Sequence, residues 1–110
     1  MRGIRVKPSP LHLLAAAVLA GCAMPNLAPP VSPAMTARAG RPVSTLEEGR
    51  RLYAGRCATC HSIDPVGKYS VPRWREIIAD MADEAKLTPT ERDAVLAYIL
   101  AARAMQPPAR

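Results

Sequence analysis

The side chains best suited to chemistry lie in the run Cys57-Ala58-Thr59-Cys60-His61. The pattern Cys-x-x-Cys-His is typical of covalent attachment of a c-type haem. Two thiols three positions apart on one turn can each add to a vinyl group of a haem. The adjacent imidazole then lies beneath the iron and supplies its proximal nitrogen ligand. We therefore predict one covalently attached haem c, held by Cys57 and Cys60 and ligated by His61.

Three other interpretations of this run explain less. A structural zinc site needs four protein ligands and a catalytic one usually three. Beyond the motif, the predicted folded region has no further Cys or His, so a carboxylate would have to complete the shell. A thioredoxin-like pair needs a βαβ context, which the pattern does not show. A disulfide between Cys57 and Cys60 is possible in an exported chain, but it leaves a small core without a large apolar group.

A haem iron also needs a sixth ligand or keeps an open site. The predicted folded region has no second histidine, and its methionines are Met81 and Met105. Met81 lies on an apolar helix stripe, where a methionine can equally be plain core. Met105 follows the last predicted helix and should be exposed. Ligation by His61 and a methionine would raise the reduction potential and suit electron transfer.

Helices are predicted on both sides of the motif. Ser44 and Glu47 stand at capping-box spacing, as do Thr45 and Glu48. Apolar residues follow at helical intervals, so we predict a helix from about Thr45 to Gly55 that runs into the motif.

Two further helices follow the motif. One should start near Pro72, because proline is tolerated in a first turn. Thr88 as N-cap, Pro89 at N1 and Glu91 at N3 mark the start of another, which should end near Arg103. No segment alternates convincingly with period two. The predicted fold is all-α, with three main helices around one covalently bound haem.

The sequence between about Val43 and Ala104 resembles the class I (mono-haem) cytochrome c family, in particular its short bacterial members. The resemblance rests on the haem motif and on two flanking patterns, which are Gly49-x-x-x-Tyr53 and Leu87-Thr88-x-x-Glu91…Tyr98-Ile99. It implies a cytochrome c-like fold in which the first and last helices cross at near right angles, with Gly49 packed against Tyr98.

The same resemblance bears on the sixth ligand. Many members of the family carry the ligand methionine in a loop before the last helix, and this chain departs from that pattern. A compact subgroup has the pattern Trp-x6-Met-x6-Thr, which Trp74, Met81 and Thr88 fit. The likeness to this subgroup implies that Met81 is the distal iron ligand.

The start of the chain has the layout of a lipoprotein leader. Residues 1–21 combine a basic beginning with an apolar stretch too short to span a bilayer. The stretch ends Leu19-Ala20-Gly21-Cys22, which resembles a bacterial lipobox, so Cys22 is the predicted lipidation site. An ordinary cleavage site beside a chance cysteine is the alternative. The residue directly after Cys22 is Ala23 rather than an acidic residue, which favours the outer membrane. The anchored protein would face the periplasm.

The rest of the chain divides into three predicted parts. Residues 22–42 are rich in proline and alanine, and proline favours extended backbone. We expect them to be a semi-rigid tether. Residues 43–105 form the predicted cytochrome domain, and 106–110 a disordered tail. A core this small usually needs a cofactor, a metal or a disulfide.

Charge and composition narrow the function further. The 110-residue chain carries a net charge of +6, and removing three basic residues of the leader leaves 12 basic and 9 acidic residues, or +3. Such a modest charge, without a basic run, does not indicate nucleic-acid binding. We expect an electron carrier rather than an enzyme, or the haem subunit of a periplasmic redox enzyme. Its partners would be a dehydrogenase, another cytochrome or a terminal oxidase or reductase. The alternative is a haem-based small-ligand sensor with an open sixth site.

Overall fold

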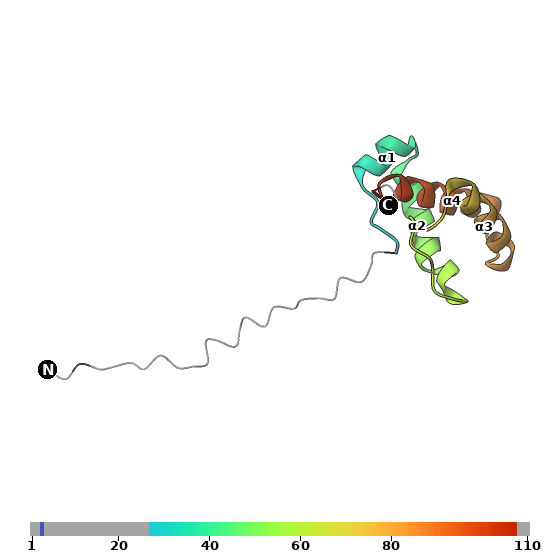
Figure 1. Ribbon diagram of the computed structural model, residues 1–110, viewed down its shortest axis with the longest axis horizontal. Helices are drawn as coiled ribbons and strands as arrows, with labels where there is room; N and C mark the ends of the chain where they lie inside the picture. Colours follow the sequence, from blue (N-terminus) through green and yellow to red (C-terminus); the bar gives the residue numbers. More distant parts are fainter. Residues whose placement is uncertain (1–2, 4–26, 108–110) are drawn as a thin grey trace.

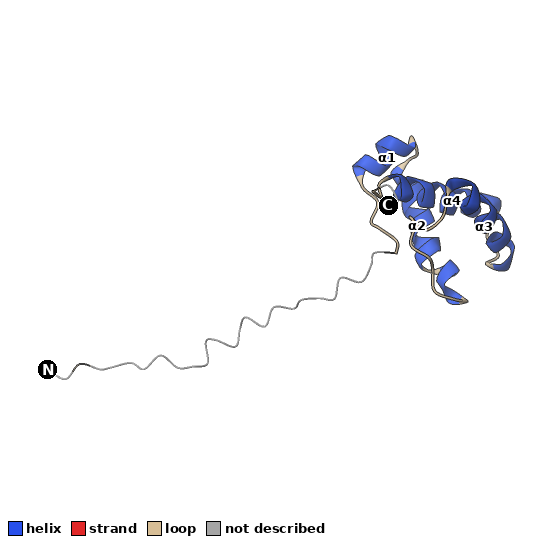
Figure 2. Ribbon diagram, in the orientation of Figure 1, coloured by secondary structure: helices blue, strands red, loops and turns tan. Residues whose placement is uncertain are grey.

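The computed structural model describes Gly3 and residues 27–107. Every regular element in this part of the chain is helical, with no strand among these residues (Figures 1 and 2). The predicted all-α class is therefore confirmed. The elements in chain order are α1 (Pro33–Ala39), α2 (Val43–Ala54), the short 3-10 helix η2 (Arg56–Thr59), α3 (Val71–Glu84) and α4 (Pro89–Ala104).

The start of α4 has the capping box expected from the sequence. Thr88 Oγ1 accepts a hydrogen bond from the Glu91 N–H at 3.2 Å, and the Thr88 N–H donates to Glu91 Oε2 at 2.9 Å. α3 begins in a related way, because the Ser70 hydroxyl accepts from the Arg73 N–H at 3.3 Å. Both helices have proline in the first turn, where a missing N–H costs nothing.

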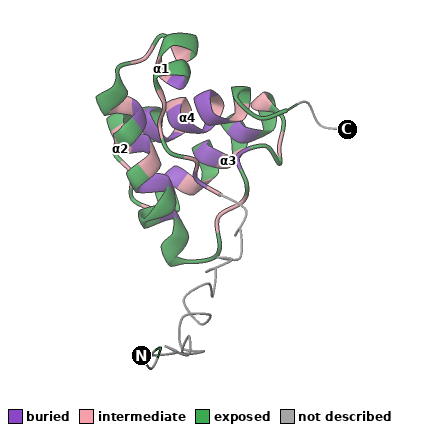
Figure 3. Ribbon diagram, turned by 90° about the vertical axis from the view of Figure 1, so that its left-hand side faces the viewer, coloured by how far each residue is buried: buried purple, intermediate pink, exposed green. Residues whose placement is uncertain are grey.

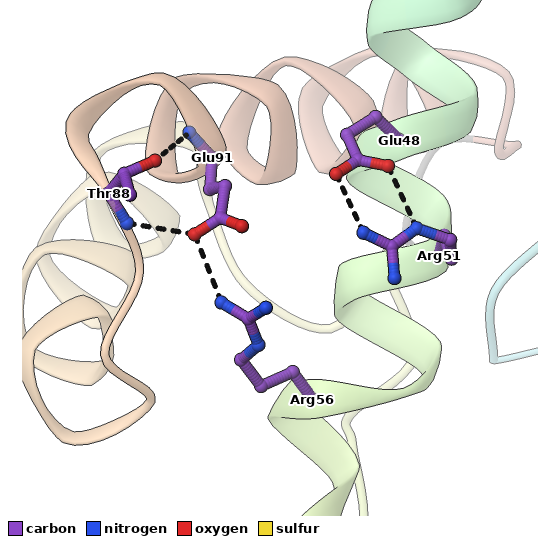
Figure 4. Close-up of polar contacts among 5 residues, drawn as sticks. All are labelled: Glu48, Arg51, Arg56, Thr88 and Glu91. Carbon is purple, nitrogen blue, oxygen red and sulfur yellow. Dashed lines mark hydrogen bonds and ion pairs between the residues drawn. The ribbon is translucent and has the colours of Figure 1, made fainter.

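The capping boxes predicted for α2 are wrong. The helix starts directly after its N-cap, Pro42, and no side chain caps it. Ser44 and Thr45 therefore lie inside the first turn, past the position from which a side chain caps the helix. Glu48 is paired with Arg51 instead, through two hydrogen bonds of 2.7 and 2.8 Å (Figure 4).

The helices α2 and α4 pack directly on one another (Figure 1). Their backbones approach very closely at Gly49. A Cβ atom on Gly49 would lie 2.0 Å from the Ala94 carbonyl oxygen and 2.7 Å from Tyr98 Cβ. Only glycine lets the two backbones approach this closely. The expected packing of Gly49 against Tyr98 is therefore present.

The core lies where α2, α3 and α4 meet, and buried residues of these helices gather there (Figure 3). Aromatic rings form part of this core. The Trp74 ring stands edge-to-face with Tyr53 at 6.1 Å and with Tyr69 at 5.1 Å between centroids. Its Nε1 donates to the Val66 carbonyl at 2.9 Å, which satisfies its only polar atom. The largest fully buried side chains are Trp74, Tyr53, Tyr98, Leu46, Leu52, Ile78, Ile99, Val66 and Val95.

The predicted tether differs most from the structure. Within the described residues 27–42, residues 33–39 form α1, which Ser32 caps and Gly40 ends with a φ of 60°. Met35 on this helix is only 2% exposed and belongs to the core. An extended spacer is therefore wrong for this stretch, because an apolar side chain binds it to the domain and proline starts the helix. The folded part therefore begins before Val43 and includes α1.

Several predicted features lie outside the described residues. They are the leader (residues 1–21, apart from Gly3), the lipidation site Cys22, and residues 108–110 of the predicted tail. α4 ends at Ala104, next to the predicted end of the domain. Among the described residues, no helix is both long and apolar enough to cross a bilayer.

Candidate functional site

The haem motif occupies the turn that follows α2. The helix ends at Gly55, and the chain tightens into η2, which carries Cys57. Cys57 is buried, whereas Cys60 and His61 are exposed. Both cysteines are free thiols. The spacing of the motif thus directs one thiol into the core and leaves the other thiol and the imidazole at the surface.

The four predicted site residues line one narrow cleft. Cys57, Cys60 and His61 contribute to its lining from the turn after α2, and Met81 contributes from near the end of α3. Arg56, Glu84 and Ala85 complete the lining. The two sides come from segments about 20 residues apart in the chain, and the structure brings them together.

Met81 and Met105 have different surroundings. Met81 is half-buried, packs against the core and lines the cleft. Met105 is 42% exposed and is absent from the lining of this cleft. Of the two candidates, Met81 is therefore the one positioned to face the motif.

The hydrogen bond of His61 selects one tautomer of the neutral ring. Nδ1 lies 2.8 Å from the Ser62 carbonyl oxygen, which can only accept, so Nδ1 carries the proton. Nε2 then keeps a free lone pair for a metal. This arrangement is common among metal-binding histidines, where a backbone carbonyl orients the ring and raises its basicity.

Burial controls the chemistry of Cys57. Desolvation raises the pKa of its thiol, and the nearby Arg56 charge offsets only part of that effect. The thiol is therefore protonated at neutral pH and is a poor ligand for a free divalent metal. Among residues 27–107, no three His, Cys, Asp or Glu side chains are grouped to hold a metal ion.

An ion pair joins the motif to α4. Arg56 Nη1 donates to Glu91 Oε2 at 3.0 Å, and the same oxygen accepts the N–H of Thr88 (Figure 4). The backbone hydrogen bond from Thr88 and then the Arg56 side chain lower the pKa of Glu91. One carboxylate therefore caps α4 and holds the residue before Cys57. The sequence predicted the cap but not this pairing, because 35 residues separate the partners.

Asp64 organises the loop after His61, a role that no sequence pattern indicated. Its carboxylate accepts hydrogen bonds from Lys68 Nζ at 2.6 Å and from Tyr69 OH at 3.0 Å. Its backbone carbonyl accepts the hydroxyl of Tyr53. The bonds from Lys68 and Tyr69 lower the pKa of Asp64, although its partial burial opposes them. The loop that carries His61 is thus fixed to α2 and to its own far end.

The chemistry of these residues fits a covalently attached haem. Two thiols, one imidazole with a free Nε2 and one thioether are the donors such a group requires, and all four line the cleft. The open space in the cleft is about 20 Å³, which is too small for a haem, so the segments that line the cleft would have to separate for one to bind. No protein-family model, curated protein or solved structure matches this chain.

Proposed function

We propose that this chain is a mono-haem c-type cytochrome that carries single electrons at a bacterial membrane. The observation that carries the proposal is the shared cleft of Cys57, Cys60, His61 and Met81. Zinc, thioredoxin or disulfide chemistry would use at most three of these residues. A haem would use all four, and the cytochrome c resemblance noted from the sequence covers the same segment.

Each side chain would have a defined task. The Cys57 and Cys60 thiols would each add S–H across one vinyl double bond, which forms two thioethers without an oxidant. His61 would ligate through Nε2 while Ser62 keeps its ring oriented. Met81 would supply the thioether sulfur on the opposite side. When bound, the haem supplies a one-electron change between ferric and ferrous iron.

The surrounding chain would hold this group and keep water away from it. Cys57 packs in the same core cluster as Tyr53 and Trp74, so that side of the site is apolar. We expect a carrier rather than an enzyme, because every side chain of the site would bind the haem or shield it from water. The partner would be a dehydrogenase, another cytochrome or a terminal oxidase or reductase, met through a small transient interface.

The proposal includes an exported location. Cleavage before Cys22 and acylation of its thiol would anchor the protein to a membrane facing the periplasm, with the outer membrane favoured. More than one acyl chain is needed for stable attachment, which lipoproteins supply.

Attachment of haem is the direct test of this proposal. The protein would be produced in a bacterium with a haem-attachment system, and its mass and haem staining would be measured after denaturation. We expect covalent haem in the wild type and its loss in a variant with both Cys57→Ser and Cys60→Ser. Cys22→Ser is the matched control, because it removes a thiol but should keep the haem. Wild-type protein that carries no haem would refute the proposal.

A further inference from the structure

The segment ahead of α2 is fastened to the domain by apolar contacts. We name residues 27–40 the strap. Met35 is 2% exposed and Ala28 is 8% exposed, and both belong to the core cluster. Val31 and Ala39 pack against the same cluster. Burial of the Met35 side chain removes apolar surface from water, so α1 is held in place although it has only seven residues.

Polar contacts fasten the same segment to two different helices. The Tyr98 hydroxyl, from α4, donates to the Pro29 carbonyl at 2.7 Å. Arg50 Nε, from α2, lies 3.0 Å from the Ala28 carbonyl and 3.1 Å from that of Pro29. Burial raises the pKa of Tyr98 to about 12, so its hydroxyl stays a donor at neutral pH. Figure 1 shows this segment passing α2 and α4 on its way to α1.

A third contact holds the far end of the strap. Arg38 Nη1 donates to the Ala104 carbonyl at 2.8 Å, where α4 ends. A helix leaves its last four carbonyls without partners, so a side-chain cation at this position stabilises both elements. The strap is therefore attached along its length, near Ala28, at Met35 and at Arg38.

We propose that the strap keeps the folded domain close to the lipid surface, whereas a flexible tether over residues 22–42 would let the domain move far from it. The inference rests on the proposed acylation of Cys22. At about 3.6 Å per residue, the six steps from Cys22 to Ala28 reach at most about 22 Å. A free tether up to Val43 would have 21 steps and could reach about 75 Å.

The reach of the tether decides how far from the bilayer the domain can meet a redox partner. The side on which Ala28 and Pro29 lie against α2 and α4 is the side nearest the bilayer. With the strap docked, the domain stays within about its own diameter of the lipid headgroups. A membrane-bound redox partner whose electron-transfer site lies close to the bilayer is within reach, and one far from it is not.

Fluorescence quenching in vesicles tests the inference. Lipidated, haem-loaded protein would be placed in phosphatidylethanolamine–phosphatidylglycerol vesicles that contain a headgroup-labelled fluorescent lipid, which the haem quenches at short range. A variant with about 15 Gly/Ser residues inserted before Leu27 gives the reach of a free tether. We expect strong quenching in the wild type and weak quenching in the insertion variant. Equal, weak quenching in both would overturn the proposal.

Two variants separate the strap from the rest of the domain. Met35→Glu combined with Arg50→Ala and Tyr98→Phe removes the contact at Met35 and the contacts near Ala28, so it should release the strap and bring quenching down to the level of the insertion variant. Met105→Glu, which places the same charge at an exposed methionine, should leave quenching as in the wild type. Quenching that the triple variant does not change, in protein with an unaltered haem spectrum, would also contradict the strap.

Limited proteolysis gives a readout that needs neither lipid nor vesicles. Cleavage by trypsin after Arg38 requires the strap to leave the domain, so it should be slow in the wild type. Arg50→Ala removes the α2 contact and should speed this cleavage about tenfold, even if the triple variant does not fold. Wild-type cleavage at Arg38 as fast as in an unfolded peptide would refute the strap. Absence of haem or of lipid would instead refute the proposed function, and mass spectrometry separates these cases.

Discussion

At the scale of single residues, type and spacing predicted which side chains would share a site, and the structure places these residues along one cleft. Cys57, Cys60 and His61 form a motif that can be read from the sequence, whereas Met81 was singled out through the likeness to a compact cytochrome subgroup. The residues that orient them are not visible in this way. Asp64 acts through a loop conformation, and Glu91 through a partner 35 positions away. Such contacts depend on tertiary structure, which periodicity does not report.

Asp64 gives a prediction at this scale. The folded state lowers the pKa of Asp64, so its stabilising effect is present above the unfolded pKa of about 3.9 and disappears as the pH falls through the folded value. We expect Asp64→Asn to lower the free energy of unfolding by about 1 kcal/mol at pH 7. The difference from the wild type should shrink below about pH 4.

Urea unfolding at pH 7 and pH 3 measures this effect. Asp83→Asn is the matched control. Asp83 is an exposed aspartate on α3 whose side chain makes no hydrogen bond to any other described residue. Its substitution should have little effect at either pH. A loss for Asp64→Asn that is the same at both values would show that the carboxylate charge is not what fixes the loop.

At the scale of elements, local signals predicted helix starts well where a cap and a proline coincide. The capping box at Thr88 and Glu91 forms as predicted, whereas the boxes at Ser44 and Thr45 do not. In α4 the cap is followed by Pro89, which fixes the first turn. In α2 the proline comes earlier, at Pro42, and moves the start of the helix ahead of both serine and threonine.

Removing the α4 cap should have a measurable cost. Thr88→Ala leaves the Glu91 N–H without its acceptor and should lower the free energy of unfolding by about 1 kcal/mol. Thr90→Ala, two residues on within the same first turn, should change it by less than about 0.5 kcal/mol. Chemical denaturation of both variants makes the comparison. Equal losses would mean that the threonine at position 88 contributes through helix propensity rather than through the cap.

At the scale of the whole molecule, the all-α class and the three main helices were predictable, but the extent of the folded unit was not. The proline content of residues 22–42 indicated a spacer, yet Pro33 begins α1 and Met35 binds it to the core. Composition does not distinguish a spacer from a strap, because one buried side chain and a few hydrogen bonds decide between them. The close approach at Gly49 was predictable only through the family resemblance.

The most direct test of the central claim is the visible spectrum of the haem-loaded protein, oxidised and reduced, with and without carbon monoxide. If His61 and Met81 both ligate the iron, the wild type will show a low-spin haem with the weak far-red methionine–iron band, and carbon monoxide will not change the reduced spectrum. Met81→Ala should lose that band and bind carbon monoxide, whereas Met105→Ala should match the wild type.

A wild-type haem that is high-spin or binds carbon monoxide would contradict this account. It would mean that Met81 is a core residue, and ligand sensing at an open sixth site would replace electron transfer as the function.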